Sequence, residues 1–370
     1  MKHLVMLGAG HAHVHMLSTL ASQGLAGVQV TLVAPHPRQL YSGMIPGYVA
    51  GHYLLDDCVI PLEPLLANSG VQWLQRSAVA LDAQTRELTL DDGSTIRYDV
   101  LSVNSGPVQD RQKIEHLMPG AREHALFVRP IEAFGALWPQ VVMLAQSRPL
   151  RVAVIGGGAA GIELACAVAY RFKTASVTLL SGVTPVAANY PAKVQARVIN
   201  ALKDRNITVI QESVSAMAAG EVTLGSGARL TCDVPILATG AQAPAWLQES
   251  GLALDGQGFM AVDACQRSTS HPQVFAAGDV CTRMDRPHAR SGVYAVRAGA
   301  PLAHNLRAVL AGIEPSRYQP QDKTLNLLSC GNRYAIASWG NWSAQGHWVW
   351  WLKNWIDRGF IKKYRPAAKP

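Results

Sequence analysis

A short apolar run followed by a glycine-rich turn and an amphipathic stretch occurs twice along the chain, about 150 residues apart. The first run, Leu4–Leu7, precedes the turn Gly8–His13, and the second, Val152–Ile155, precedes the turn Gly156–Gly161. Apolar runs of this length beside glycine are typical of buried strands that end in a tight turn and open a helix. Such a turn directs backbone N–H groups and a helix N-terminus at a pyrophosphate. The pattern therefore predicts two dinucleotide-binding units.

The elements after each turn recur in the same order, namely helix, strand, hairpin and closing strand. We therefore expect an α/β protein of two Rossmann-like dinucleotide-binding domains, with the second inserted into the first, plus a small C-terminal element. The expected division is 1–110 and 235–312 for the first domain, 111–234 for the second, and 313–370 for the C-terminal element. The expected elements are a helix to 23, strand 28–33, hairpin 88–98 and strand 100–103, then a helix to 172, strand 176–180, helix 193–204, strand 207–210, hairpin 222–231 and strand 234–240, then strand 274–280 and helices 292–309 and 348–360.

Composition supports a protein with buried sheets rather than a disordered one, because 49% of the 370 residues are apolar and only 16% are charged. No uninterrupted apolar run is long enough to predict a transmembrane helix. The first strand begins near residue 3, which leaves no room for a signal peptide, so we expect a cytoplasmic protein. The net charge of +8 suits anionic cofactors or an anionic membrane surface, or serves solubility alone. No nucleic-acid-binding motif is present, and we expect no nucleic-acid partner.

The cysteine and histidine spacings do not indicate a metal site. None of the six cysteines forms a C-x-x-C pair, so we expect neither a redox disulfide between neighbours nor a zinc knuckle. Of His11, His13 and His15, only the first and last share a helical face, and no carboxylate completes a site. We expect His11 and His13 to border a pyrophosphate instead.

The two glycine turns differ in how completely they match the dinucleotide fingerprint. In the first, Gly8 and Gly10 fit the tight turn and the close approach of phosphate, but His13 stands where the third glycine is usual. The second is complete in Gly156, Gly158 and Gly161. Neither second strand ends in the usual ribose-binding carboxylate, since the first ends at Ala34-Pro35 and the second at Ser181-Gly182. The sequence therefore favours neither NADH nor NADPH.

A third motif, Thr269–Val280, strongly resembles the second FAD signature of the two-dinucleotide-domain flavoprotein reductases. The resemblance implies that Asp279 accepts hydrogen bonds from the ribityl chain of FAD and that Gly278 lets the backbone approach. It also implies that the helix beginning near Ser291 points its positive N-terminal end at the flavin. The candidate cofactor-binding residues are Gly8, Gly10, His11, Ala12, Ala34, Pro46, Gly106, Gly278, Asp279, Gly292 and Val293, with Gly156, Gly158 and Gly161 in the second turn.

The segment Tyr41–Gly51 resembles the type II NADH:quinone and sulfide:quinone oxidoreductase branch of these flavoproteins. Together with the Gly-His-Ala-His turn and the helix 292–299, it is most similar to the flavoprotein domains fused ahead of selenide, water dikinase. The resemblance covers nearly all of 1–312. It implies that Glu163, two residues after the third glycine, lies near nicotinamide and flavin. Tyr294 is a second candidate for proton transfer.

Two departures from that branch bear on the electron acceptor and the donor. Val293 and Arg297 stand where the type II enzymes carry two glutamines that face the quinone. The sulfide-oxidising relatives use paired cysteines near the flavin, whereas here no cysteine lies near Met44–Gly47 and Cys330 is the only late candidate.

Six of the nine tryptophans fall between Trp339 and Trp355. Trp348, Trp351 and Trp355 recur at helical spacing with Leu352 and Ile356, and basic residues follow them. This combination suits a membrane interface. The alternative is that the helix packs on its own protein or on a second copy in a homodimer. If the helix binds membranes, deletion of 346–370 should release the protein from anionic vesicles. Unchanged sedimentation with the vesicles would contradict membrane contact.

The function predicted from these features is that of an FAD-dependent oxidoreductase, which passes electrons from NAD(P)H through FAD to a quinone or another acceptor. One alternative is flavin-dependent oxidation of a sulfur or selenium compound. The other is a flavin-bound interaction or sensor protein with slow turnover.

Overall fold

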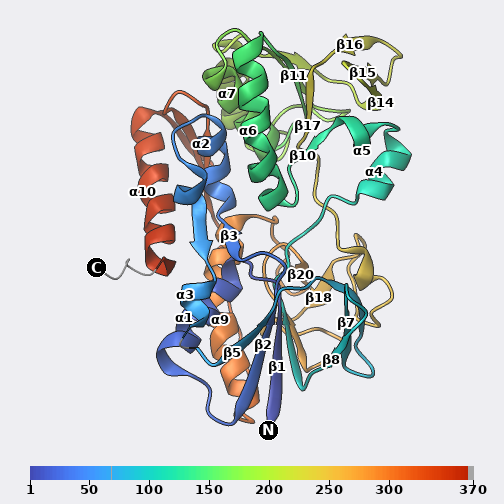
Figure 1. Cartoon of the computed structure of the whole chain (residues 1–370). Coiled ribbons are helices and arrows are strands. Elements are labelled where there is room, and N and C mark those ends of the chain that lie inside the picture. Colours follow the sequence, from blue (N-terminus) through green and yellow to red (C-terminus); the bar gives the residue numbers. More distant parts are fainter. Residues whose placement is uncertain (68, 366–370) are drawn as a thin grey trace.

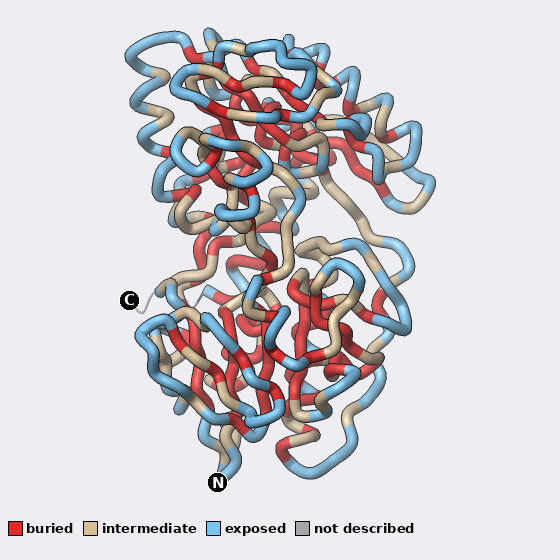
Figure 2. Tube along the Cα trace, turned by 90° about the vertical axis from the view of Figure 1, so that its right-hand side faces the viewer, coloured by how far each residue is buried: buried red, intermediate tan, exposed pale blue. Residues whose placement is uncertain are grey.

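A computed structural model describes residues 1–67 and 69–365 of the chain. It has two lobes, each built on a five-stranded parallel sheet, and a C-terminal unit lies beside both of them (Figure 1). Buried residues fill the interior of each lobe, while exposed residues follow the outer turns (Figure 2). The alternation of strand and helix predicted from the sequence is therefore confirmed as a mixed α/β fold.

The first lobe carries the N-terminal glycine turn and a sheet of order β19-β9-β1-β2-β5. Its strands are near-continuous apolar runs because helices cover one face and an antiparallel sheet covers the other. Helices α1 and α9 pack side by side on the first face. The bounds are β1 Lys2–Leu7, α1 His11–Gln23, β2 Val28–Val33, β5 Val71–Leu74, β6 Ala78–Asp82, β7 Glu87–Leu90, β8 Thr95–Arg97, β9 Val100–Val103, η3 Ala245–Leu247, β18 Met260–Val262, β19 Val274–Ala276, β20 Cys281–Arg283 and α9 Gly292–Leu310.

The second lobe repeats this plan with a sheet of order β10-β17-β11-β12-β13 and a second antiparallel sheet, β14-β15-β16. The bounds are α4 Arg111–Leu117, α5 Ala121–His124, β10 Leu126–Phe127, α6 Ile131–Ser147, β11 Arg151–Ile155, α7 Ala159–Arg171, β12 Ser176–Leu180, α8 Ala192–Lys203, β13 Thr208–Ile210, β14 Val214–Ala218, β15 Glu221–Leu224, β16 Arg229–Thr231 and β17 Val234–Leu237. The boundary expected at residue 235 falls inside β17, which pairs with both β10 and β11. The chain therefore leaves this lobe after Leu237 rather than before it.

A connecting segment and the C-terminal unit join the lobes. Helix α2 lies against α7, and the C-terminal sheet β21-β22-β23 packs on α7, α8 and α10. Figure 1 shows α10 along one side of the molecule, next to α2. The bounds are β3 Arg38–Leu40, η1 Ser42–Met44, α2 Ile45–Val49, η2 Leu55–Cys58, β4 Val59–Pro61, α3 Glu63–Leu66, β21 Leu325–Ser329, β22 Ala335–Trp339, β23 Trp342–Gly346 and α10 His347–Tyr364.

Helix α10 carries apolar side chains both on its buried face and on its exposed face. One face is buried in the core through Val349, Trp350, Phe360 and Ile361. The other exposes Trp348, Trp351, Trp355 and Ile356. No helix in the part of the chain that the structure describes combines the length and apolarity needed to cross a bilayer.

Candidate functional site

The first glycine turn joins β1 to α1 and admits no larger side chains. Gly8 has a φ of +86°, and a Cβ there would collide with the backbone of Ser105. A Cβ at Gly10 would collide with the side chain of Asn104. The turn is therefore pressed against the loop that follows β9, as the two glycines predict.

His13 occupies the place of the third fingerprint glycine and does not border a pyrophosphate, so that expectation is wrong. Its side chain is fully buried, with Nδ1 2.5 Å from the Gly8 carbonyl oxygen and Nε2 2.8 Å from Ser102 Oγ. Burial lowers the pKa of His13 to about 4, so the ring is neutral. Because a carbonyl only accepts, Nδ1 carries the proton and Nε2 accepts from Ser102. His13 thus fixes the turn to β9.

Asn104 is a central residue of this site that sequence reasoning missed. Its Oδ1 accepts hydrogen bonds from the backbone N–H groups of Ala12 and His13 at 3.0 and 3.1 Å. Its Nδ2 donates to the carbonyl of Ala277 at 2.5 Å. One side chain therefore holds the first glycine turn to the Gly278 loop. The available signal was a polar residue ending a buried strand immediately before Ser105-Gly106.

The loop that carries Asp279 lies against the first turn of α9, because a Cβ at Gly278 would lie 3.3 Å from the Cβ of Ala295. An anionic or polyhydroxylated ligand would find partners at this helix end. Burial raises the pKa of Asp279, although the charges of Arg129, Arg290 and His288 oppose this effect. Ser291 precedes α9, but its hydroxyl does not cap the helix. Ser291 Oγ and His11 Nε2 are both buried without a partner among the described residues.

These observations fit FAD, since the segments of the FAD signature offer the uncapped N–H groups of α9 and a carboxylate, and Ser291 Oγ and His11 Nε2 add two buried polar atoms without partners among the described residues. Arg129, which sequence reasoning also missed, adds a cation near Asp279 and His11. It comes from the second lobe, just before α6, so both lobes contribute to this site.

The second glycine turn is open to a ligand at its middle position. Gly156 has a φ of +132°, and a Cβ at Gly161 would collide with the carbonyl of Gly156. A Cβ at Gly158, in contrast, would meet nothing within 4 Å. Helix α7 starts directly after Gly158 without a capping side chain. At the end of β12, the buried hydroxyl of Ser181 has no partner among the described residues. The turn therefore fits a pyrophosphate, with a hydroxyl rather than a carboxylate at the ribose end.

Glu163 lies where α7, η1 and α10 meet, in a group of side chains that we call the Glu163 cluster: Glu163, Lys353, Asp357 and Tyr41. Glu163 Oε1 accepts a hydrogen bond from the Ser329 N–H at 2.8 Å. Lys353 Nζ donates to Asp357 Oδ2 and to the Gly43 carbonyl, both at 2.7 Å. The resemblance to the type II enzymes implied a role for Glu163, but its partners Ser329, Lys353 and Asp357 come from the C-terminal unit.

The charges of the cluster set its protonation. Burial raises the pKa of Glu163 to about 7, with Lys353 and the Ser329 N–H opposing. Burial also opposes the charge of Lys353, but the carboxylates of Asp357 and Glu163 outweigh it and raise the pKa of the ammonium group. Burial and the adjacent Asp357 raise the pKa of Tyr41 far above its ordinary value. At neutral pH the cluster therefore contains one carboxyl that can readily gain or lose a proton.

Tyr294, the other candidate for proton transfer, lies outside this cluster. Its ring stacks on His288, with centroids 3.8 Å apart, and its hydroxyl is 3.5 Å from the Gln321 carbonyl. Arg297, on the same helix, is exposed.

The remaining predicted cofactor residues lie on the first lobe and its connecting segment. Their placements are Ala34 buried at the end of β2, Pro46 buried in α2, Gly106 with a φ of +73° after β9, Gly278 with a φ of +78° beside Asn104, Gly292 at the start of α9 and Val293 partly buried behind it.

Cys330 is buried in the core and contacts Cys166 rather than the first glycine turn. The Cys166 thiol, together with burial, raises the pKa of Cys330 well above its ordinary value. Cys330 is therefore a neutral thiol in this structure.

Comparison with known proteins finds oxidoreductases by family profile and by sequence similarity. A family profile described as pyridine nucleotide-disulphide oxidoreductase matches residues 2–299. An NADH dehydrogenase-like protein of Mycobacterium tuberculosis is 30% identical over 264 residues, which cover 67% of this chain. The chain spans 64% of the length of that relative. A demethylphylloquinone reductase of Synechocystis is 24% identical, over 89% of this chain and 85% of the relative.

Two solved structures share the fold over the whole chain. The sulfide:quinone oxidoreductase of Aquifex aeolicus has a TM-score of 0.80 at 18% identity, covering 99% of this chain and 92% of that one. NDH2 of Plasmodium falciparum, solved in complex with NADH, has a TM-score of 0.80 at 14% identity and covers both chains completely.

Proposed function

The chain belongs to the pyridine nucleotide-disulphide oxidoreductase family, whose members use FAD and NAD(P)H, and from this premise we propose that it is an NAD(P)H dehydrogenase. Electrons would pass from NAD(P)H through FAD to a quinone or a similar acceptor. The observation that supports a nicotinamide donor best is the open N-terminus of α7 at Gly158, in a complete glycine triplet.

The chain's own residues would bind the cofactors and hold a proton. Asp279, the N-terminus of α9 and the first glycine turn would hold FAD, and the second turn would hold the nicotinamide dinucleotide. Bound FAD supplies the redox chemistry. Reduction of a quinone by NADH consumes one proton besides the hydride that NADH supplies. We propose that the Glu163 carboxyl holds that proton, because its pKa of about 7 leaves it partly protonated at neutral pH.

Rapid mixing of the holoprotein with each electron donor tests this proposal. NADH or NADPH should bleach the flavin absorbance near about 450 nm within the time of one turnover. Bleaching by sulfide or selenide, but not by NADH or NADPH, would favour the alternative function, flavin-dependent oxidation of a sulfur or selenium compound. The resemblance of Tyr41–Gly51 to sulfide:quinone oxidoreductases motivates this arm of the test. Absence of bleaching by any of them would indicate a flavin-bound sensor or interaction protein.

A substitution at Gly158 tests the nicotinamide site without disturbing the fold. Gly158→Ala places a methyl group in open space, at a φ of −82° that alanine adopts freely. We expect the KM for NADH to rise about 10-fold or more, because the methyl group obstructs the approach of the pyrophosphate. Flavin content and thermal stability should not change. Gly256→Ala is the matched control, since a Cβ there also meets nothing within 4 Å.

We further propose that the exposed tryptophans dock the protein on a membrane surface, where quinones are dissolved. The Trp surface consists of Trp339, Trp342, Trp348, Trp351 and Trp355, whose side chains are 49–73% exposed. Exposed basic residues, Arg358, Lys362 and Lys363, lie on the same helix as three of these tryptophans. Indoles beside basic groups match the interface of an anionic bilayer.

Replacement of Trp348, Trp351 and Trp355 by alanine should weaken binding to anionic vesicles about 10-fold, which corresponds to about 1.4 kcal/mol for the three indoles. These substitutions are preferable to deletion of 346–370, because the deletion would also remove the core residues Val349 and Trp350. Co-sedimentation with vesicles measures the effect. The control variant replaces three exposed apolar residues elsewhere, Leu117, Met143 and Val183, by alanine. Equal sedimentation of the two variants would contradict membrane docking. A tryptophan-dependent dimer on a sizing column would support the packing of two copies instead.

A further inference from the structure

A basic cavity of about 530 Å³ lies between the second lobe and the C-terminal unit. Its lining includes Lys173 just after α7, Arg197 in the middle of α8, Arg205 just after α8, and His347 at the start of α10. Two aromatic rings, Tyr170 and Tyr334, complete the wall. One carboxylate, Asp204, shares the lining with these cations. The volume is that of a small-molecule site.

The cavity is separate from both dinucleotide sites. It adjoins the C-terminal end of α7 and the turn from α8 to β13, where the parallel strands β12 and β13 begin. The glycine turn of the same lobe lies at the opposite edge, where β11 ends. Dinucleotides bind at that carboxyl edge of a parallel sheet, so the basic cavity is not part of the nicotinamide site.

The cationic groups are anchored by contacts that leave donors free. Arg205 Nε donates to the Cys330 carbonyl at 2.5 Å and its Nη1 to the Ala201 carbonyl at 2.7 Å, so Nη2 has no partner in the part of the chain that the structure describes. The guanidinium lies 5.6 Å from the centre of the Tyr334 ring, and Lys173 Nζ lies 4.4 Å from that of Tyr170. Among residues 1–67 and 69–365, neither Lys173, Arg197 nor Arg205 forms a salt bridge.

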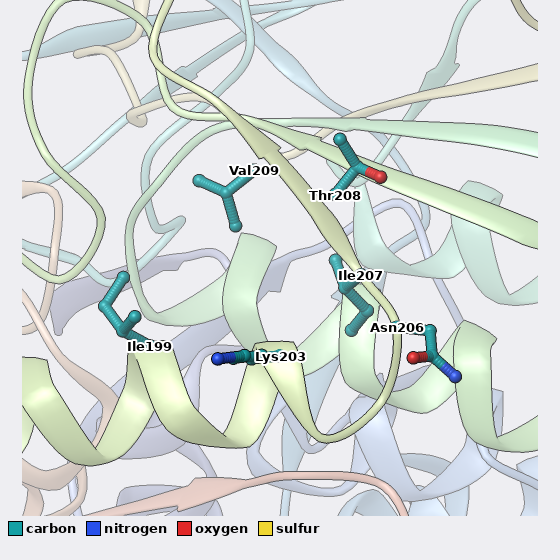
Figure 3. A pocket seen from close by; sticks show the side chains of 6 residues that line it. All are labelled: Ile199, Lys203, Asn206, Ile207, Thr208 and Val209. Atoms are coloured by element: carbon teal, nitrogen blue, oxygen red, sulfur yellow. The ribbon is translucent and has the colours of Figure 1, made fainter.

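A second hollow on the same lobe differs from the basic cavity in the residues that line it. It lies on the edge strand β13 and on α8, and Figure 3 shows that Ile199, Ile207 and Val209 contribute apolar side chains to it. Of the described residues that line it, Lys203 is the only cation. A single lysine beside apolar side chains indicates no ligand.

We propose that the basic cavity binds the phosphate group of an anionic ligand. Guanidinium and ammonium groups line the cavity together with side-chain amides, and donors of these kinds match the oxygens of a phosphate or phosphodiester. The phosphate could belong to a membrane phospholipid or to a free phosphate compound. Gln345 and His347 in the lining adjoin the Trp surface at Trp348, which gives a lipid headgroup direct access. The lipid source rests on the proposed membrane docking, whereas phosphate binding itself does not.

The test compares two charge-matched double variants of the FAD-loaded protein. Lys173→Gln with Arg197→Gln removes two cations of the cavity. Lys113→Gln with Arg122→Gln removes two exposed cations from α4 and α5, on the far side of the second lobe from α10 (Figure 1). Titration calorimetry with inorganic pyrophosphate should show binding about 10-fold weaker for the cavity variant than for the control. The two variants should unfold at the same temperature.

A second arm distinguishes the sources of the phosphate. Vesicles of phosphatidylcholine are compared with and without about 30% phosphatidylglycerol, a proportion that supplies anionic headgroups at physiological density. If the cavity variant binds less well than the control to anionic vesicles only, the ligand is a lipid headgroup. If it also binds pyrophosphate less well, the cavity binds phosphate groups in general. Equal behaviour of the two variants in both arms would overturn the proposal, even if the Trp surface binds vesicles.

Discussion

The Asp279→Ala variant should be purified with little or no bound FAD. If the carboxylate accepts two hydrogen bonds from the flavin's side chain, its loss removes about 3 kcal/mol or more, since bonds to charged groups contribute about 1.5–3 kcal/mol each. FAD should then bind at least about 100-fold more weakly. Fluorescence titration of the apoprotein with FAD measures the dissociation constant directly.

The stability of the apoprotein separates loss of FAD from misfolding. Burial raises the pKa of Asp279 in the folded chain, so ionisation of this group opposes folding, and its contribution becomes less favourable as pH rises above the ordinary value of 3.8. Asp279→Ala removes that cost. The variant apoprotein should be at least as stable at pH 7 as the wild-type apoprotein, while FAD should stabilise the wild type alone.

Asp56→Ala serves as the control, because it removes an exposed carboxylate that forms only a 3.8 Å ion pair with Arg38 within residues 1–67 and 69–365. Full FAD content in Asp279→Ala would show that the coenzyme is held elsewhere and would contradict the assignment of the first lobe.

The fold could be predicted from sequence because its strands are buried on both faces. Runs such as Val100–Val103 are apolar at nearly every position, and each is bounded by glycine or turn residues, so both the elements and their order were predictable. The predicted end of the second lobe was misplaced because β17 continues directly from a hairpin, and its pairing with β10 and β11 is non-local.

The site was predictable only where a local motif determines it. Glycine spacing indicated Gly8, Gly10, Gly158 and Gly161, because the four positions belong to two short motifs that each follow a strand and open a helix. Asn104 and Arg129 depend on contacts with distant segments, which no local pattern specifies. The same holds for the partners of Glu163, because Lys353 lies almost 200 residues further along the chain.

The role of His13 was misinterpreted for a related reason. A histidine near a phosphate-binding turn suggested contact with the ligand, but its ring enters the space between α1 and β9. The third glycine normally allows a helix to pack closely on its strand. Here a neutral imidazole fills that contact and satisfies two polar groups in the core. We infer that the hydrogen bonds of His13 to Gly8 and Ser102 take the place of the close contact between helix and strand that a glycine would allow.

The exposed face of α10 shows how the two interpretations of the C-terminal tail combine. Packing on the protein explains Val349 and Trp350, whereas Trp348 and Trp351 remain uncovered one residue away. Lys353 and Asp357 emerge between these faces and reach into the Glu163 cluster. The proposed membrane helix is therefore also part of the proposed proton-handling site. The surface that is proposed to dock on the membrane, where quinones are dissolved, would therefore lie next to the group that is proposed to supply a proton to the quinone.

That arrangement makes Glu163→Gln the most informative substitution for catalysis. Glutamine keeps an oxygen that can accept the Ser329 N–H, so the local structure should persist, but it cannot release a proton. We expect reduction of a soluble quinone to slow about 100-fold or more, the usual contribution of a positioned acid or base. Bleaching of the flavin by NADH, which needs no proton from this group, should change much less.

The pH dependence provides the second readout. In the wild type, the quinone rate should fall as pH rises through about 7, because the raised pKa of Glu163 marks the loss of its proton there. Its stability should also fall between the ordinary pKa of 4.5 and about 7, since the folded chain binds the proton more tightly than the unfolded chain. Both trends should flatten in Glu163→Gln and persist in Glu249→Gln, an exposed control. If the inflection near pH 7 survives in Glu163→Gln, the proton comes from another group, and the cluster only joins α10 to the second lobe.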